Sequence, residues 1–491
     1  MKLDAEALTR LLCELRRTMP AAADPVEPLV GLVFLKYLAD QDGPTARWHV
    51  PACAAWASLL SAGRGYGDAL NQAIEALCQT NPELQDVLFG LDFNRVAEGE
   101  EVHRRDDALL PLLRQLDRVS LTEGLVSSDT LGDAVSRFLE EAAVDARLDH
   151  NAHTPLALAR LMAVLLEPAA GMSICDPVSG VGATLAMVAT IAARRAGCLR
   201  RTMDLDLCGQ ERSPRAARLC RMNLLLHGMS AASEVTIATG DVLQHPKLVR
   251  SAASGVREHD ALRRFDRVVA HPPYSLPGWG AAQAAHDRFS RYSFGVPHAD
   301  QGDFAFIQHC YASLHPLGGR AVLLVLPGVL YRGGEEGRIR QRMLEADAIA
   351  AVIRLRPKLL HGTPSESLLL VLERGKPPAR RGTVLLIDAE QEMLDAKDPQ
   401  TLAEVSAHIL GCYQSWREEP GFSVVASMDD LAPTEYDLQP HRYIKKPLPA
   451  QRRLDAMRQE LPRLQERRER AYAQMDALLA ALDGPQHGVQ R

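Results

Sequence analysis

Short apolar runs alternate with stretches of helical spacing between about residues 150 and 375, and this alternation restricts the possible folds more than any other feature. The clearest runs lie at residues 172–175, 265–270 and 320–326. Strands separated by helices pair in parallel, because each crossover helix returns the chain to the same end of the sheet and covers one face. We therefore predict a doubly wound α/β sheet, in which ligands bind at the carboxyl ends of the strands.

The two flanks of this segment have a different texture. At the N-terminus, apolar residues recur at helical spacing over residues 8–15 and 29–38, with few alternating Val or Ile positions. We predict three domains: a helical domain over residues 1–145, the sheet domain over residues 146–445 and a C-terminal helix over residues 446–491.

The C-terminal segment carries a narrow apolar seam on an otherwise charged sequence. Its positions step by three and four residues and are interrupted at Arg468. The seam consists of Leu454, Met457, Leu461, Leu464, Ala471, Met475, Leu478 and Leu482. Such a helix either binds a partner or packs back on its own domain, and the sequence leaves both open.

Composition limits the class of protein and of partner. With 491 residues, 46% of them hydrophobic, the chain can bury a full core. A formal net charge of -6 argues against a chain that holds a phosphate backbone alone, since such affinity comes from many Lys and Arg contacts. No run approaches a membrane span and the first residues lack an apolar signal region, so we expect a cytoplasmic protein with no membrane contact.

The cysteines predict neither a disulfide framework nor a metal site. There are nine of them, an odd number, and none forms a close CxxC pair. Cys198, Cys208 and Cys220 come nearest to a cluster, but their spacing fits no ligand pattern. We expect reduced thiols and no metal.

A glycine-rich motif follows the first apolar run of the predicted sheet. Asp176 ends that run, and Gly180 and Gly182 follow within six residues. Glycines allow a tight turn into the next helix and bring backbone N–H groups close to a ligand, as in nucleotide sites. Asp176 can accept from the ammonium group of a cofactor or from a water. The third glycine of the dinucleotide fingerprint is missing, because Leu185 stands there.

Two further acids fall at the ends of the next predicted strands. Glu211 is placed to hold both ribose hydroxyls of a cofactor, and Asp241 to accept from an adenine amino group. Each acid alone is more often a helix cap or a turn residue. Because all three strand-end acids occur in order, we expect a cofactor site.

A second motif, His271-Pro272-Pro273-Tyr274, follows another strand. Its prolines lack N–H donors, which leaves carbonyl groups free to accept from a substrate amine. Tyr274 offers a face on which a base swung out of a duplex can stack. The alternative is a Pro-Pro turn with a packed tyrosine. Together the two motifs predict methyl transfer from S-adenosylmethionine to the amino group of a nucleobase.

Other segments extend the pattern over nearly the whole length of the chain. They are Leu29 to Asp40, Thr154 and Pro155, Arg221 to Gly228, Gly302-Asp303-Phe304-Ala305-Phe306, Gly318-Gly319-Arg320 and Leu326 to Gly334. With these segments the chain resembles the methylation subunit of type I restriction-modification systems, a family of adenine-N6 DNA methyltransferases. The segments at 302–306 and 326–334 are the most specific.

The resemblance implies a fold, a cofactor and partners. The fold is a Rossmann-like α/β sheet of the S-adenosylmethionine-dependent methyltransferases, with an N-terminal helical domain and a C-terminal helix. It implies cofactor binding by Thr154 and Pro155 in addition to the residues above. The substrate is double-stranded DNA, which a separate specificity subunit reads. Such complexes hold two copies of the methylation subunit and, in some cases, a restriction and translocase subunit.

The chain departs from the family pattern at the catalytic motif. Asn, or Asp in relatives, usually stands where this sequence has His271. A neutral imidazole has one acceptor nitrogen on a rigid ring, and a protonated one has none. The glycine loop also has Ala183 in place of a usual glycine. Removing one preorganised polar contact costs about a hundred- to a thousand-fold in rate.

These departures leave three hypotheses. The first is an active adenine-N6 DNA methyltransferase subunit in which His271, Pro272, Pro273 and Tyr274 form the base side. The second is a catalytically impaired scaffold or DNA-binding subunit of a defence complex. The third keeps the chemistry but changes the acceptor to RNA or to a protein glutamine amide. Neither the recognition sequence nor the stoichiometry can be read from the chain.

Overall fold

The structure is a computed structural model. It describes residues 4–19, 25–41, 46–63, 65–94, 102–145, 153–229, 234–250, 261–360, 366–395, 398–445, 457–458, 460–470, 472–473 and 475.

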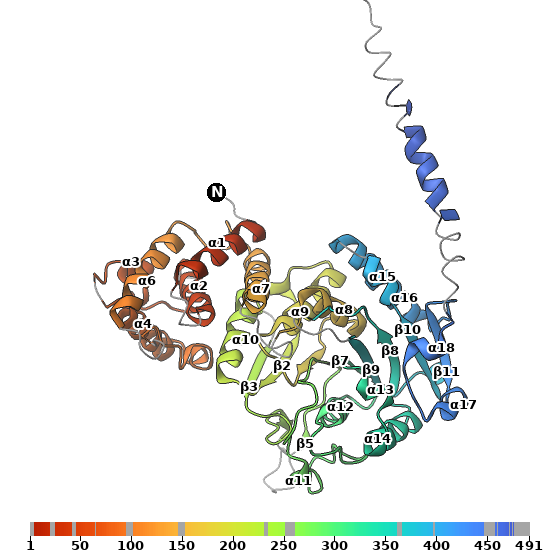
Figure 1. The fold of residues 1–491 in the computed structure, drawn as a ribbon. Helices are drawn as coiled ribbons and strands as arrows, with labels where there is room; N and C mark the ends of the chain where they lie inside the picture. Colours follow the sequence, from red (N-terminus) through yellow and green to blue (C-terminus); the bar gives the residue numbers. More distant parts are fainter. Residues whose placement is uncertain are drawn as a thin grey trace, which may run out of the picture.

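The N-terminal region is helical, as predicted. Its helices are α1 (Ala5–Thr18), α2 (Val26–Gln41), α3 (Trp56–Leu60), α4 (Tyr66–Thr80), α5 (Gln85–Leu88), α6 (Val102–Asp117) and α7 (Ser128–Asp145). The second helix is buried over most of its length, and its Leu29, Leu32 and Phe34 are inaccessible to solvent. Figure 1 shows these helices as a bundle beside the sheet, with α7 next to α10 (Pro214–Leu226).

The central part is a nine-stranded sheet with the order β11-β10-β8-β9-β7-β6-β1-β2-β3. The strands are β1 (Ser173–Asp176), β2 (Asp206–Glu211), β3 (Glu234–Thr239), β6 (Arg267–Ala270), β7 (Gly319–Val325), β8 (Ile349–Arg354), β9 (Leu368–Arg374), β10 (Thr383–Asp388) and β11 (Ser423–Ser427). A separate hairpin pairs β4 (Val249–Arg250) with β5 (Ala261–Leu262). The apolar runs predicted as strands coincide with β1, β6 and β7, which confirms the α/β prediction.

The sheet is parallel from β3 through β2, β1 and β6 to β7, but not throughout. Strand β9 inserts antiparallel between β7 and β8, and β11 runs antiparallel to β10. The chain moves from β1 toward β3 on one side and places β6 on the other side of β1. A ligand crevice is expected at this switch point, at the carboxyl ends of β1 and β6.

Helices cover both faces of the sheet. One face packs against α8 (Leu156–Leu166), α9 (Ala183–Ala196), α10 (Pro214–Leu226) and α16 (Pro399–Ser415). The other face packs against α12 (Asp303–Ala312) and α14 (Gly334–Glu345). The remaining short helices are α11 (Ala281–Ala284), α13 (Gly328–Tyr331), α15 (Glu390–Asp395), α17 (Met428–Leu431) and α18 (Pro440–Tyr443).

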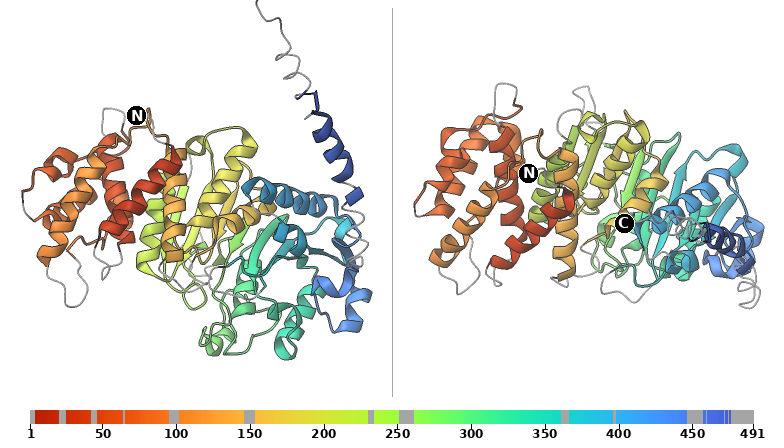
Figure 2. Two further views of the ribbon diagram at one scale, coloured as in Figure 1. Left: turned by 45° about the horizontal axis from the view of Figure 1, so that its top comes forward. Right: turned by 90° about the horizontal axis from the view of Figure 1, so that it is seen from above.

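Helix α10 joins the helical region to the sheet. Its Leu219, Met222 and Leu226 belong to the same apolar core as the N-terminal helices. The contact with α7 is close, because a Cβ added to Gly132 would lie 2.8 Å from the Cα of His227. Figure 2 shows from two sides that the α1–α7 bundle stands at the β3 end of the sheet.

The C-terminal segment is helical where the structure describes it, and its apolar side chains are exposed. Met457, Leu461, Leu464 and Met475 are between 48% and 55% exposed. Figure 1 shows the described part of this helix standing away from the rest of the chain. Leu454, Ala471, Leu478 and Leu482 of the predicted seam lie outside the described residues. Within the described part of the chain, no helix has both the length and the hydropathy needed to span a membrane.

Candidate active site

A cavity of about 520 Å³ opens at the carboxyl ends of β1, β2, β3 and β6. Its walls combine residues from both predicted motifs with residues from helices α2, α7 and α10. They include Val26, Leu139, Thr154, Asp176, Val178, Gly180, Glu211, Leu219, Asp241, His271, Pro273 and Phe306. The topology brings these residues together because parallel strands end at one edge.

The glycine loop between β1 and α9 requires glycine at two places. Gly180 and Gly182 have φ angles of 51° and 83°, in the left-handed region that residues with a Cβ rarely adopt. Gly182 is the N-cap of α9, and a Cβ there would lie 2.9 Å from Cys220 Sγ. A Cβ on Gly180 would meet nothing within 4 Å. Gly182 therefore seats the loop on α10, and Gly180 faces the cavity.

Asp176 is 1% exposed and stabilises the glycine loop through two hydrogen bonds. Its Oδ1 accepts from the backbone N–H of Val178 at 3.0 Å, and its Oδ2 accepts from the hydroxyl of Thr184 at 2.6 Å. Burial raises the pKa of the Asp176 carboxyl to about 7, against the effect of these two donors. Both oxygens thus shape the loop, while the predicted contact with a cofactor stays a prediction.

Glu211 and Asp241 combine a turn role with a place in the cavity wall. Glu211 accepts from the N–H of Gly180 at 2.9 Å and from the N–H of Ser213 at 2.8 Å. Asp241 Oδ1 accepts from the N–H of Leu243 at 2.9 Å. Carboxylates in such positions are expected in turns and caps. Because both residues also line the cavity, a structural role in the turns is compatible with the predicted role in binding a ligand.

His271 is 7% exposed, and both of its ring nitrogens have protein partners. Nδ1 lies 2.9 Å from Thr154 Oγ1, and Nε2 lies 2.8 Å from the hydroxyl of Tyr274. The imidazole and phenol rings are tilted by 46° with centroids 5.4 Å apart. In this arrangement the imidazole bridges Thr154 and Tyr274, and its acceptor nitrogen is already in use.

The loop after His271 is held by residues from two distant segments. Ser275 has a φ of 47°, and its N–H donates to Asp303 Oδ1 at 3.1 Å. Asp303 is buried and forms an ion pair with Arg332 at 2.7 Å. These residues belong to the segments 302–306 and 326–334, so those segments position the base-side loop.

Comparison with known proteins agrees with this geometry. The sequence model of the N-6 DNA Methylase family matches residues 126–450, more than half of the chain. The chain belongs to this family. The match spans the whole sheet together with helix α7, the element that contributes Leu139 to the cavity.

Several methylase subunits of type I restriction enzymes are similar to this chain over most of its length. The MjaVIII type I restriction enzyme methylase subunit of Methanocaldococcus jannaschii is 26% identical over 79% of this chain and 65% of its own length. The HindI methylase subunit of Haemophilus influenzae is 24% identical over 80% of this chain and 89% of its own length. The chain spans slightly less than two thirds of the first curated relatives it matches, 65%, 62% and 64%.

Solved structures share the fold. The methyltransferase subunit of a type I restriction-modification system from Streptococcus thermophilus superposes with a TM-score of 0.74 at 21% identity. The likeness covers 90% of this chain and 100% of that one. A chain from a type I restriction-modification complex gives a TM-score of 0.63 at 18% identity, over 98% of each chain. These likenesses confirm the predicted Rossmann-like sheet with its N-terminal helices.

The structure places most, not all, of the predicted site residues of this family member in the cavity wall. Those that line it are Thr154, Asp176, Gly180, Glu211, Asp241, His271 and Pro273. Those absent from its lining are Pro155, Gly182, Pro272 and Tyr274. Pro155 is the N-cap of α8, and Tyr274 packs against the sheet core beside His271. Their predicted binding roles stay predictions.

The N-terminal helices form a part of the cavity wall that the sequence did not predict. Val26, Leu139 and Ala142 line the cavity although they precede the glycine loop by 34 residues or more. Nothing in their local pattern differs from that of an ordinary buried helix face. Only the packing of α10 against α2 and α7 brings them to the site.

Proposed function

We propose that this chain is the methylation subunit of a type I restriction-modification-like complex, and that it transfers the methyl group of S-adenosylmethionine to adenine N6 in double-stranded DNA. One observation carries the proposal. The same cavity is lined by the glycine loop, by the strand-end acids Glu211 and Asp241, and by His271 and Pro273 of the second motif. The family membership and the type I names of the relatives support it.

The residues present fit the proposed cofactor. A cavity of about 520 Å³ lies within the range of ordinary small-molecule sites. Its carboxylates, Glu211 and Asp241, suit hydroxyl and amino donors, and its walls at Val178, Leu219 and Val242 suit a flat apolar ring. S-adenosylmethionine would supply an electrophilic methyl group. Thr154, Asp176 and Gly180, which also line the cavity, would contact the cofactor as well. Pro155 and Gly182, which do not line it, would support these contacts.

On the base side, acceptors have to draw the adenine amino group toward tetrahedral geometry. His271 can do so only as a neutral imidazole, and only after Nε2 has exchanged the Tyr274 hydroxyl for the amine. Thr154 then keeps the ring in place through Nδ1. Tyr274, released from His271, is free to stack on the base. Pro272 and Pro273 have no backbone N–H, so they add no donor that would compete with the amine for acceptors.

The partners follow from the charge and from the exposed C-terminal helix. A net charge of -6 leaves DNA affinity to a specificity subunit, and the apolar seam of residues 446–491 offers that subunit a surface. The complex would contain two copies of this chain and, where present, a restriction and translocase subunit. We also propose the domain limits 1–145, 146–445 and 446–491, and a cytoplasmic location.

A second candidate rests on the engagement of both nitrogens of His271. A histidine held by Thr154 and Tyr274 has no acceptor left for the base, and it replaces the usual Asn of the family pattern. The chain would then bind cofactor or DNA as a catalytically impaired scaffold. The acceptors RNA and glutamine amide have no observation in their favour.

The test is methyl transfer from labelled S-adenosylmethionine to genomic DNA that lacks its own modification. The unmodified chain, co-expressed with the specificity subunit encoded beside it, is compared with His271→Asn. His441→Asn, at an exposed position of helix α18, serves as the control. We expect transfer by the unmodified chain and the control. Transfer by the Asn variant alone would establish the scaffold. Bound cofactor without transfer by any variant would overturn the proposal.

A further inference from the structure

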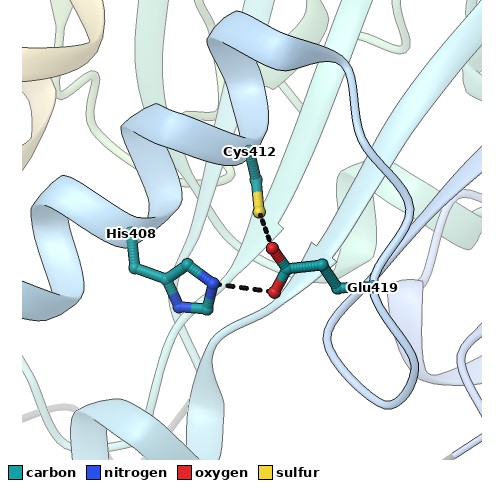
Figure 3. Close-up of side chains that lie close together, drawn as sticks. All are labelled: His408, Cys412 and Glu419. Atoms are coloured by element: carbon teal, nitrogen blue, oxygen red, sulfur yellow. Dashed lines mark hydrogen bonds and ion pairs between the residues drawn. The ribbon is translucent and has the colours of Figure 1, made fainter.

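Three potential metal ligands lie together at the end of helix α16, far from the cavity in the sequence. His408 and Cys412 are four residues apart, so they share one face of the helix, and Glu419 reaches them from the loop that follows. Figure 3 shows His408 and Cys412 both directed toward the carboxylate of Glu419. Their ligand atoms lie within 4.8 Å of one another, and no other such group occurs among the described residues.

The three side chains already contact one another. The carboxylate of Glu419 lies 2.8 Å from His408 Nε2 through one oxygen and 3.3 Å from Cys412 Sγ through the other. Both contacts are drawn in Figure 3. An imidazole nitrogen and a thiol thus meet the two oxygens of one carboxylate. Imidazole, thiolate and carboxylate are all ligands of zinc in proteins.

Each ligand is held in place by its surroundings. The ring of His408 stacks on Phe422, with centroids 4.2 Å apart and planes within 8°. Cys412 is inaccessible to solvent. The backbone of Glu419 pairs with Ser423, its N–H donating to Ser423 O at 3.1 Å and its O accepting from Ser423 N at 2.9 Å. To bind an ion, His408 and Glu419 have to exchange their direct contact for bonds to the ion, while the helix and the backbone of the loop stay in place.

One cation already touches this group. The guanidinium of Arg417 forms an ion pair with Glu419 and lies 3.9 Å from Cys412 Sγ. The Arg417 side chain is 56% exposed, and the His408 side chain is 37% exposed. An incoming ion can therefore reach the group from solvent, and Arg417 can swing outward without leaving a buried charge. Arg417 competes with a metal ion for the same negative charge.

We propose that His408, Cys412 and Glu419 form a Zn²⁺ site, with water as the fourth ligand. Nitrogen, sulfur and oxygen donors in one set favour zinc over magnesium or calcium, which prefer oxygen donors alone. On binding, the thiol of Cys412 releases its proton to solvent, and thiolate and carboxylate together neutralise the ion. The site clips the end of α16 to the loop that enters edge strand β11. This proposal does not depend on the proposed methyl transfer.

The test is titration of the full-length chain, freed of metal by a chelator, with Co²⁺ as a spectroscopic probe and then with Zn²⁺ in competition. We expect a thiolate-to-cobalt charge-transfer band that saturates at one ion per chain and disappears when Zn²⁺ is added. Cys412→Ser removes the band. Cys198→Ser, at an exposed free cysteine outside the group, is the control and keeps it.

Arg417→Gln gives the sharper readout, because it changes no ligand. Without the competing guanidinium, we expect the chain to bind Co²⁺ and Zn²⁺ at least several-fold more tightly. His408→Gln and Glu419→Gln keep the size of the partly exposed side chains and should weaken binding at least ten-fold, with circular dichroism checking that the chain is folded. A band that survives Cys412→Ser would overturn the site. So would a metal affinity that is the same in folded His408→Gln, in folded Glu419→Gln and in the original chain.

Discussion

At the scale of single residues, the most consequential feature of the site is the pair of hydrogen bonds that joins Thr154 to His271 and His271 to Tyr274. An imidazole at this position can serve a base only if one of its two partners is displaced. The same bonds fix the ring in a single orientation, because each nitrogen is paired. If His271 binds the base as proposed, the loss of one of these bonds adds a conformational cost to that step.

Replacing Tyr274 with Phe tests the strength of this contact. The variant keeps the aromatic ring but leaves His271 Nε2 without its partner, so we expect a loss of about 1 kcal/mol in the free energy of unfolding. The measurement is urea unfolding. Tyr331→Phe, at a side chain 50% exposed, is the control and should unfold as the original chain does. Equal stability of the two variants would mean that the bond contributes nothing.

Asp176 predicts a pH dependence with a definite sign. Burial raises the pKa of this carboxyl to about 7 in the folded chain, above its value of about 4 in the unfolded chain. The unfolded state therefore loses the proton first, and stability contributed by this group falls as the pH rises toward and through 7. Asn keeps the shape and has no such charge. Between pH 5 and 8.5, the free energy of unfolding of Asp176→Asn should rise relative to that of the original chain by on the order of 2 kcal/mol.

The measurement is the free energy of unfolding of both chains across this pH range without cofactor. Asp266→Asn is the control. Burial raises the pKa of the Asp266 carboxyl, but other interactions, of which the hydrogen bonds from Ser173 are the largest, lower it by more, so the pKa lies below its ordinary value. Asp266 is therefore ionised in both the folded and the unfolded chain across this pH range. A stability difference for Asp176→Asn that does not change with pH would contradict the burial argument.

At the scale of elements, glycines show where one helix depends on another. Gly132 lies inside α7 and touches α10 so closely that a Cβ would meet the backbone of His227. Gly411 lies inside α16 and has open space around its Cβ position. The same substitution therefore acts in opposite directions on two helices.

Gly132→Ala should destabilise the chain by about 1–3 kcal/mol, because the added methyl forces α7 away from α10. Gly411→Ala should instead stabilise it by about 0.5–1 kcal/mol, because alanine loses less backbone entropy in a helix. Thermal unfolding of both variants measures the difference. Destabilisation by both would mean that helix packing does not distinguish the two sites.

At the scale of the whole molecule, the helical region and the sheet form one site rather than two separate units. Helices α2 and α7 supply part of the cavity wall, and their core continues into α10. Burial of this apolar contact makes the shape of the cavity depend on the N-terminal helices. In the C-terminal helix, by contrast, the described apolar side chains Met457, Leu461, Leu464 and Met475 are exposed.

Charge on the seam should separate assembly from folding. Leu461→Glu combined with Leu464→Glu places two carboxylates on side chains that are more than half exposed. We expect unchanged thermal unfolding, because surface substitutions of this kind cost little, and loss of the complex with the specificity subunit. Size-exclusion chromatography of the co-expressed chains measures the complex. Arg463→Glu, on the neighbouring exposed position, is the control, and a complex retained by the double variant would exclude this seam as the interface.

The amino-acid sequence by itself determined the elements and the order of the motifs. Hydrophobic periodicity and turn chemistry are local properties, so the strands β1, β6 and β7, the glycine loop and the acids at Glu211 and Asp241 could be predicted from short windows. The family resemblance rested on the same local patterns. What these windows could not contain was the antiparallel position of β9, since strand order depends on pairing between distant segments.

Only the tertiary structure decided which residues meet. It paired His271 with Thr154, 117 residues earlier, and brought Leu139 to the cavity wall. It also left the described part of the C-terminal seam exposed and gathered His408, Cys412 and Glu419, whose spacing follows no cysteine-pair motif. Contacts of this kind arise from burying apolar surface between elements, and that free energy depends on the whole packing and not on any one stretch of sequence.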